Sequence, residues 1–327
     1  MRAIVTSTHG GPDVLTITEL PDPQPADGEV VIDIEAFGLN HAELYFRDGR
    51  WGDLDVAPVT GIECAGTIAL DRTGRLAPGT KVVAIMGGMG RTRNGTYAEK
   101  VSVPATNVVA VDTGLSWADL VAVPETYATA WTTLHHNLAV APGQTVLVRG
   151  ATSALGQAVV NIAADFGVAV IATTRNPERR ALLFDLGAKD VLLDDGGLAT
   201  QAQAAGIVID AAVDLVGSSA LRDTLAAVRP GGRVCQIGFL GGLGPVVDFD
   251  PLVDLPSGVQ LSFFGSFMFG SEHFPLDAVP VQELIAKAEA GVYQAKPARV
   301  FGFDEVPEAH KVMEANQALG KLVVSVH

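Results

Sequence analysis

The chain has few cysteines and no excess of basic residues, and both absences narrow what it can be. Its two cysteines, Cys64 and Cys235, stand far apart and form no CxxC pair, so we expect buried thiols in a reducing cytoplasm. Lys and Arg number 22 against 37 Asp and Glu, which gives a formal net charge of −15. That charge argues against nucleic acid or an anionic membrane surface as the partner.

Long apolar runs are also absent. A membrane-spanning helix needs about 20 apolar residues, and the run FFGSFMFG at 263–270 is far shorter. The opening MRAIVTSTHGG lacks a charged segment followed by an apolar one, so we expect no secretory signal. With 327 residues, 48% of them hydrophobic and 18% charged, the chain is typical of a compact protein with two domains.

The chain divides into three zones by the rhythm of its apolar residues. Residues 1–118 read as short strands separated by Pro and Gly clusters, which favours an antiparallel barrel or sandwich with one helix at about 40–47. Residues 119–265 alternate strands with helices, which predicts a doubly wound parallel sheet. Residues 266–327 return to mixed character and end in the strand KLVVSVH. We expect this last zone to rejoin the first, so that 119–265 form an inserted domain.

A small-residue turn at 146–156, VLVRGATSALG, follows a β-rich run and precedes a helical pattern. Strand, tight turn and helix together form a site for a dinucleotide pyrophosphate, because helix N-termini offer free N–H groups and partial positive charge. The first two glycine positions of the pattern hold Ala151 and Ser153, and Gly156 keeps the third. The Ser153 hydroxyl is a candidate donor to the phosphate.

The next strand ends in Thr173, Thr174 and Arg175 and is followed by Arg179 and Arg180. An acidic residue there would bind the ribose hydroxyls of NAD, whereas arginines suit the additional phosphate of NADP. A solvated helix face is the alternative for these arginines. The sequence therefore predicts NADPH.

Several long segments together resemble the medium-chain dehydrogenase/reductase superfamily and, within it, the zinc-free NADPH:quinone oxidoreductases. The segments are GPDVLTITELPDPQPADGEVVIDIEAFGLNHAELYFRDG, PVTGIECAGTI, AVPETYATAWTTL, the turn and the closing GKLVVSV. The resemblance implies a Rossmann domain, 119–265, inserted in a chaperonin-10-like β-barrel catalytic domain formed by 1–118 and 266–327. It also implies a homodimer or homotetramer, of which we expect the homodimer.

The resemblance implies that the chain uses no zinc. Zinc alcohol dehydrogenases have Cys at the position of Asn40 and His at that of Ile62, and a third ligand close to Glu125. One candidate ligand cannot make a catalytic zinc site, which needs about three protein ligands.

Asn40 and Tyr45 match the substrate-facing Asn and Tyr of the zinc-free enzymes and are the expected catalytic residues. The alternatives are a helix cap for Asn40 and core packing for Tyr45. His41 matches a position that in related enzymes approaches the pyrophosphate, and the alternative is a solvent-exposed histidine. Glu63 is expected to pack or to orient its neighbours.

The cofactor-binding residues that the resemblance implies lie in six segments. Arg179 matches the Lys that binds the 2′-phosphate. Lys321 matches a basic position near the cofactor, and the alternative for Lys321 is a solvated side chain. The phenylalanines at 263, 264, 267 and 269 line the site, seal a subunit interface or fill the core. The full expected set is Thr129, Ala151, Ser153, Ala154, Leu155, Gly156, Thr174, Arg175, Arg179, Gly238, Phe239, Leu240, Ser266, Phe267 and Lys321.

Without a metal, a conjugated acceptor is favoured because the incoming negative charge spreads onto a distant oxygen. We therefore expect an NADPH-dependent reductase of quinones or other α,β-unsaturated carbonyl compounds, located in the cytoplasm. The alternatives are an enoyl-thioester reductase, acting on acyl-CoA or carrier-protein substrates, and a catalytically silent NADPH-binding protein. The sequence identifies neither the native acceptor nor the proton donor.

Overall fold

The computed structural model describes residues 1–327, which divide into two compact units. Unit 1 comprises Met1–Glu125, Ser266–Gly291 and Ala295–His327, and unit 2 comprises Thr126–Gly265 and Val292–Gln294. Residues 119–125, which the sequence groups with the alternating strands and helices, lie in unit 1. The reason is that the preceding helix, α2 (Trp117–Val121), packs against strands of unit 1.

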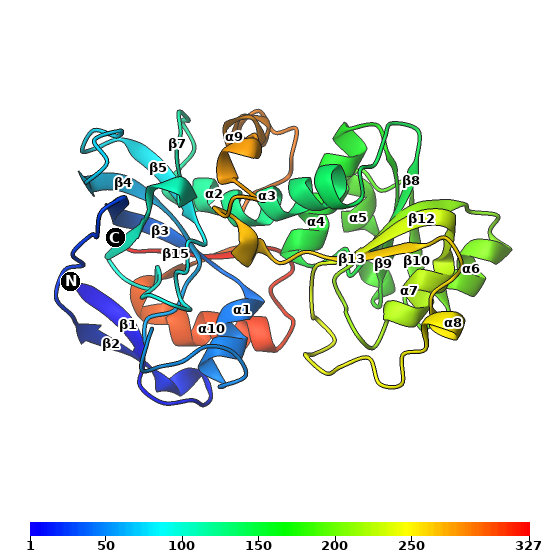
Figure 1. Cartoon of the computed structure of the whole chain (residues 1–327), viewed down its shortest axis with the longest axis horizontal. Coiled ribbons are helices and arrows are strands. Elements are labelled where there is room, and N and C mark those ends of the chain that lie inside the picture. The colour runs from blue at the N-terminus through cyan, green and yellow to red at the C-terminus, as the bar shows by residue number, and fades with distance from the viewer. The chain divides into compact units, whose positions relative to one another are not determined.

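Unit 1 is built on a seven-stranded sheet in the order β14-β15-β3-β4-β5-β7, with β6 paired to β3 (Figure 1). A separate two-stranded sheet pairs β1 with β2. All pairings are antiparallel except that of β14 with β15. The strands are β1 (Arg2–Thr6), β2 (Leu15–Glu19), β3 (Glu29–Leu39), β4 (Glu63–Asp71), β5 (Lys81–Ile85), β6 (Lys100–Pro104), β7 (Val108–Ala110), β14 (Arg299–Gly302) and β15 (Leu322–Ser325).

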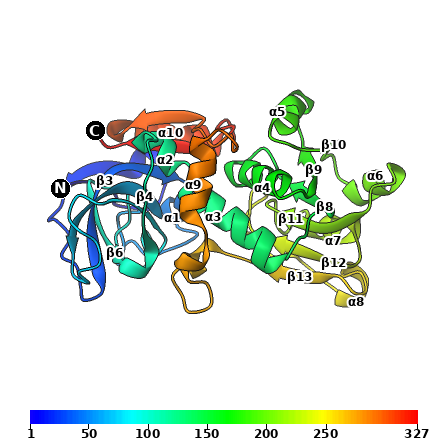
Figure 2. The ribbon, with the colours of Figure 1, turned by 90° about the horizontal axis from the view of Figure 1, so that it is seen from above.

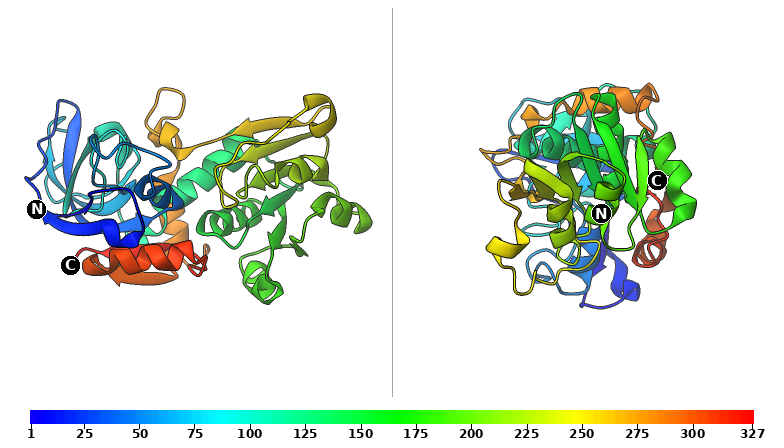
Figure 3. Two further views of the ribbon diagram at one scale, coloured as in Figure 1. Left: turned by 90° about the horizontal axis from the view of Figure 1, so that it is seen from below. Right: turned by 90° about the vertical axis from the view of Figure 1, so that its right-hand side faces the viewer.

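Strand β3 organises this unit because three other strands pair with it. Its apolar residues Val30, Ile32, Ile34 and Phe37 are almost fully buried in one hydrophobic core that also takes side chains from β4, β5, β6 and β15. The helices of unit 1 are α1 (His41–Arg47), α2, α9 (Val281–Glu289) and α10 (Val306–Glu314). Figure 3 shows α10, in red, beside the C-terminal strands, with which it is in contact.

Unit 2 contains a six-stranded sheet in the order β10-β9-β8-β11-β12-β13, with every pairing parallel (Figure 2). The predicted doubly wound parallel sheet is confirmed. Its elements are α3 (Pro124–Thr132, continued by a π-helical turn Thr133–Asn137), β8 (Thr145–Arg149), α4 (Ala154–Asp165), β9 (Ala169–Thr174), α5 (Arg180–Asp185), β10 (Asp190–Leu193), α6 (Leu198–Ala204), β11 (Ile209–Asp214), α7 (Leu221–Ala227), β12 (Val228–Gln236), α8 (Pro251–Asp254) and β13 (Gln260–Phe263).

Helices cover both faces of the unit 2 sheet. Helices α6 and α7 bury leucines against Leu147 and Ile171 in one core cluster, so they lie on the face to which these two strand residues point. Helix α4 contacts β8 and β9 but contributes nothing to that cluster. Because side chains alternate between faces along a strand, α4 packs on the opposite face, against Val146, Val148 and Val170.

Several elements were not foreseen from the sequence, among them β14 and α6. Strand β14 is only four residues long, and three of its four residues are exposed, so it has no alternation of apolar and polar residues that would mark a strand. Helix α6, LATQAQA, is mostly small and polar, so its apolar stripe of Leu198 and Ala202 is too narrow to stand out.

A buried polar network joins helices α1 and α10 in unit 1. The Arg47 guanidinium donates to His310 Nδ1 over 3.0 Å, and Tyr97 Oη lies 2.9 Å from His310 Nε2. Because a guanidinium can only donate, Nδ1 must be the acceptor and the ring proton must lie on Nε2. Burial, with Arg47 alongside, lowers the pKa of His310 to about 3, so the ring is neutral at pH 7.

We predict that His310 makes the fold sensitive to acid. Its folded pKa of about 3 lies below the ordinary value of 6.5, so the stabilisation is complete above pH 6.5 and is lost as pH falls toward 3. Between pH 7 and pH 5 the loss is about 2 kcal/mol for one such group. Urea unfolding of the wild type and of His310→Gln at both pH values measures it. The variant should lack this part of the pH dependence, and equal slopes in both proteins would contradict the prediction.

Candidate functional site

A buried ion pair lies beside the N-terminus of α1 in unit 1. The Lys321 ammonium, next to β15, is 2.5 Å from Glu63 Oε1 at the start of β4, and the two side chains are 5% and 0% exposed. The same ammonium donates to Asn40 Oδ1 over 2.6 Å. Three segments that are distant in the sequence therefore meet at one cation.

The lysine fixes the orientation of the Asn40 amide. An ammonium has no acceptor, so the atom that faces it must be the carbonyl oxygen, and the NH2 group points the other way. Asn40 Nδ2 lies 3.1 Å from Glu63 Oε1 and 3.5 Å from Glu43 Oε1. Asn40 also precedes the first residue of α1, and its backbone N–H donates to Glu43 Oε2 over 2.5 Å. The residue thus stands at the cap position while its amide is held by the ion pair.

The pKa values of Glu43 and Lys321 are both shifted in this cluster. Burial raises the pKa of Glu43 to about 8, even though Lys321 nearby acts to lower it. Burial also disfavours the charge of Lys321, but Glu63 and Glu125 outweigh that effect and raise its pKa above the ordinary value. At pH 7 the cluster therefore holds a charged Lys321 and a protonated Glu43.

Gly38 on β3 is required by this ion pair. A Cβ at this position would lie 2.3 Å from Glu63 Oε1 and 2.8 Å from Lys321 Cε. Strand β3 pairs with β15 in a register that places Gly38 opposite Val323, close to the lysine. Any larger residue would displace the carboxylate or the ammonium.

Tyr45 lies on α1 and is 8% exposed. The Arg50 guanidinium lies over its ring, 4.6 Å from the centroid. Burial raises the pKa of Tyr45, so the phenol is protonated at neutral pH and has a proton to donate. His41 is half-buried, and burial together with Lys321 lowers its pKa, so its ring is neutral.

The small-residue turn of unit 2 joins β8 to α4 as expected. A Cβ on Gly156 would lie 2.5 Å from the Gly150 carbonyl oxygen, so only glycine allows the helix to approach the strand this closely. The backbone N–H groups of Ala154 and Leu155, in the first turn of α4, have no acceptor in the chain. They are available to an anion.

The Ser153 hydroxyl is used within the turn. It donates to the Gly150 carbonyl oxygen over 2.9 Å and accepts from the Gly156 N–H over 3.1 Å. A hydroxyl has one proton, so in this conformation Ser153 caps α4 and does not offer a hydrogen bond to a phosphate. The suggestion that Ser153 is a phosphate donor is corrected accordingly.

The arginines after β9 have no ion-pair partner in the chain. Arg175 is exposed, Arg179 and Arg180 are partly exposed, and none of the three forms a salt bridge or a side-chain hydrogen bond. Thr174 is buried and uses its hydroxyl on the backbone of Asn176. Asn176 caps the next turn, a 3-10 helix, by accepting from the Glu178 N–H over 2.9 Å.

The remaining predicted cofactor residues occupy two loops and a helix. Gly238, Phe239 and Leu240 follow β12, and the Leu240 N–H donates to the Leu215 carbonyl oxygen over 2.9 Å. Thr129 is buried in α3, where its carbonyl oxygen accepts from Thr133. Ser266 and Phe267 form a short 3-10 turn in unit 1.

The four phenylalanines of 263–269 differ in burial. Phe264 and Phe269 are buried in the core, whereas Phe263 and Phe267 are 50% and 42% exposed. They also divide between the units, because Phe263 and Phe264 lie in unit 2 and the other two lie in unit 1.

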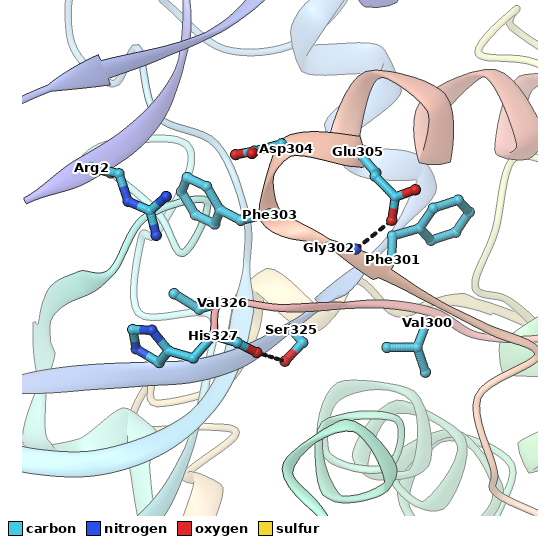
Figure 4. A pocket seen from close by; sticks show the side chains of 10 residues that line it. All are labelled: Arg2, Val300, Phe301, Gly302, Phe303, Asp304, Glu305, Ser325, Val326 and His327. Atoms are coloured by element: carbon cyan, nitrogen blue, oxygen red, sulfur yellow. Dashed lines mark hydrogen bonds between the residues drawn. The ribbon is translucent and has the colours of Figure 1, made fainter.

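A cavity of about 520 Å³ in unit 1 involves none of the predicted site residues (Figure 4). Two of the charged groups in its wall already have hydrogen-bond partners in the chain. Arg2 binds Glu99, and Glu305 accepts from the Gly302 N–H over 2.7 Å. It is lined by Arg2, Val300, Phe301, Gly302, Phe303, Asp304, Glu305, Ser325, Val326 and His327.

Sequence reasoning missed two features of unit 1. It gave Glu63, Asn40 and Lys321 separate roles. Glu63 and Lys321 are 258 positions apart, and nothing in the order of residues shows that they form an ion pair. It also missed Arg91, whose guanidinium lies between the rings of Trp51 and Phe267. The glycines on both sides of Arg91 in MGGMGRTRNG were the available signal, since they indicate a tightly folded loop.

Known proteins are similar in sequence to this chain along almost its whole length. A family model described as alcohol dehydrogenase GroES-like domain matches residues 26–113, and one described as zinc-binding dehydrogenase matches residues 186–324. The quinone oxidoreductase of Homo sapiens is 27% identical over 338 residues, covering 99% of this chain and 97% of that protein. The chain belongs to the medium-chain dehydrogenase/reductase superfamily.

Solved structures of this superfamily agree in fold. A mycobacterial protein in complex with NADPH has a TM-score of 0.87 and 27% identity, with 100% of each chain covered. The CurK enoyl reductase has a TM-score of 0.83 and 25% identity, with 99% of this chain and 98% of that chain covered. The predicted superfamily, its GroES-like and Rossmann folds and the oxidoreductase class are confirmed.

The side chains of this superfamily member do not fit a zinc ion. No group of three or more His, Cys, Asp or Glu side chains among residues 1–327 is placed to hold a metal. Ile62 offers no donor atom, and the Asn40 carbonyl oxygen already accepts from the Lys321 ammonium. A cation next to that ammonium would also be repelled.

No helix of the structure is long and apolar enough to cross a membrane.

We predict that removing the charge of Lys321 destabilises unit 1. Lys321→Met leaves Glu63 buried without its counter-charge, which costs about 3–5 kcal/mol. The double variant Lys321→Met/Glu63→Gln removes both charges and should recover most of the loss. Urea unfolding gives the free energies.

Lys287→Met is the matched control, because Lys287 pairs with Glu283 on the exposed surface of α9 over 3.3 Å. An exposed pair of this kind contributes about 0.3–0.5 kcal/mol. A Lys321→Met variant no less stable than this control would show that the buried pair does not support the fold.

Proposed function

We propose that this oxidoreductase transfers a hydride from NADPH to quinones or other α,β-unsaturated carbonyl compounds, without a metal. The observation that carries the proposal is the Lys321–Glu63 pair, which holds Asn40 beside α1 where a zinc enzyme needs a ligand. Hydrogen-bond donors and a buried cation remain at this position. Such groups suffice for a conjugated acceptor, because its developing charge is spread over several atoms.

Each residue of the site has a distinct role in this proposal. The Tyr45 phenol donates to the acceptor oxygen as its negative charge develops. The Asn40 NH2 group, which also donates to Glu63, gives a second hydrogen bond to that oxygen in place of its 3.5 Å contact with Glu43. Lys321 adds positive charge next to Asn40, and Glu63 prevents the lysine from turning away. Orientation of the acceptor by these groups accounts for much of the rate. When bound, the reduced nicotinamide supplies the hydride.

NADPH fits the side chains of unit 2. The close turn at Gly156 and the free N–H groups of Ala154 and Leu155 suit the pyrophosphate. The unpaired Arg175 and Arg179 suit the 2′-phosphate, because guanidinium groups bind phosphate through paired hydrogen bonds. The mycobacterial relative that was solved with NADPH supports this choice of cofactor.

An enoyl-thioester reductase is the alternative within the same chemistry. The likeness to the CurK enoyl reductase supports it, since an enoyl thioester is also a conjugated carbonyl. A silent NADPH-binding protein is the alternative outside enzymes.

The proposed assembly is a homodimer in the cytoplasm. Strand β13 lies at the edge of its sheet, and Leu261 and Phe263 on it are 39% and 50% exposed. An unpaired apolar edge favours pairing with a second copy. Light scattering should then give twice the chain mass of 34.0 kDa, and a monomer mass would reject the dimer.

We predict turnover of conjugated acceptors after removal of metal. Protein dialysed against EDTA should oxidise NADPH with quinones and enones, as followed by the loss of its absorbance, and elemental analysis should find no stoichiometric zinc. Tyr45→Phe should lower kcat about a hundredfold because one donor to the developing oxyanion is lost. Reduction of enoyl thioesters alone would select the alternative enzyme. Tight NADPH binding without any turnover would select the silent protein.

We predict that Arg179 determines the preference for NADPH over NADH. Arg179→Ala removes one charge-assisted contact to the 2′-phosphate, which costs about 1.5–3 kcal/mol, or about ten- to hundredfold in affinity. Affinity for NADH should not change. The control is Arg229→Ala in the same unit, because Arg229 is paired with Asp210. Equal use of both cofactors by the wild type would refute the arginine argument.

A further inference from the structure

Arg91 lies in a tightly turned loop that follows β5 in unit 1. Met86, Gly87, Gly88 and Gly90 in this loop have positive φ angles, and the Arg91 N–H donates to the Gly88 carbonyl oxygen over 3.1 Å. The backbone at Arg91 is therefore set by the loop. This gives the side chain a defined starting point.

Two aromatic rings hold the Arg91 guanidinium. Its central carbon lies 4.4 Å from the ring centroid of Trp51 and 4.9 Å from that of Phe267. Stacking on aromatic faces leaves the N–H groups at the edge of the guanidinium plane available. Three segments of unit 1, at positions 51, 91 and 267, therefore cooperate to present one planar cation.

No group of the chain neutralises this cation. Arg91 forms no salt bridge and no side-chain hydrogen bond, whereas Arg50 binds Asp48 and Arg93 binds Glu29. Burial alone lowers the pKa of Arg91, and no carboxylate opposes the effect. A partly desolvated and unpaired guanidinium is costly, so a bound anion would recover that cost.

Arg91 is connected to the proposed acceptor site through Trp51. The backbone N–H groups of Arg50 and Trp51 donate to the Tyr45 carbonyl oxygen over 2.9 and 3.0 Å. The loop that carries Trp51 is thus attached to α1 at the residue that we propose as a donor to the acceptor.

We propose that Arg91 binds a carboxylate of the acceptor, so that the substrates are α,β-unsaturated carbonyl compounds that carry a carboxylate. The proposal rests on the proposed function. One planar guanidinium matches one carboxylate through two parallel hydrogen bonds. The several phosphate charges of coenzyme A would need several cations, and the neighbouring Arg50 is already paired with Asp48.

Steady-state kinetics with 4-oxo-2-pentenoate and its methyl ester test the proposal. The wild type should prefer the acid, and Arg91→Met should lower kcat/KM for the acid about ten- to hundredfold, mainly through KM, and leave the ester unchanged. Arg91→Lys keeps the charge but loses the paired hydrogen bonds, so it should retain part of the preference. Arg299→Met is the matched control, because Arg299 stacks on Phe301 at 4.3 Å on the exposed surface.

A binding measurement without turnover separates this inference from the proposed function. The saturated acid 4-oxopentanoate should quench the fluorescence of Trp51 in the wild type and in Arg299→Met, but not in Arg91→Met. If neither acceptor is reduced and this pattern of quenching persists, the proposed function fails and the carboxylate site stands. If the wild type reduces acid and ester equally well, or if 4-oxopentanoate does not bind, the role of Arg91 is overturned. Selective reduction of enoyl-CoA over both small acceptors would also overturn it.

Discussion

One ammonium group joins the parts of unit 1 on which the proposed chemistry depends. Lys321 bonds to Glu63 and to Asn40, so it links the end of the chain to the start of β4 and to the N-terminus of α1. A buried cation needs compensation, and Glu63 and Glu125 raise the pKa of Lys321 against the opposing effect of burial. Burial keeps Glu43 protonated at pH 7. Gly38 leaves the space that the Lys321–Glu63 pair occupies, because no larger side chain fits beside it.

The same interaction determines what Asn40 can do. Its carbonyl oxygen is held by a group that only donates, so the amide has one orientation, with its NH2 group toward Glu63 and Glu43. A lysine next to the position of a metal ligand also makes that position unsuitable for a cation. The site therefore has hydrogen-bond donors in place of a Lewis acid, which favours acceptors whose charge is delocalised.

Both units contain arginines that are paired with carboxylates and arginines that are not. Most arginines of this acidic protein are paired with carboxylates, as Arg149 is with Asp194. Arg175, Arg179 and Arg91 are not paired, and each of them stands where an anionic part of a ligand is proposed. In a chain with a net charge of −15, unpaired arginines are informative because carboxylates are abundant. These three arginines lack an ion pair because the fold places no carboxylate within reach of their guanidinium groups.

The sequence by itself determined the local features of this protein. Alternation of strands and helices predicted the parallel sheet, and the pattern VLVRGATSALG predicted the turn between β8 and α4. These features depend on neighbours in the sequence, which is why they can be predicted from it. Only the tertiary structure decided that Lys321 is buried against Glu63, that the Ser153 hydroxyl caps its own turn, and that Arg91 lies between two rings. Side-chain partners of this kind depend on packing, because a charged group in the sequence carries no mark of which distant residue will neutralise it.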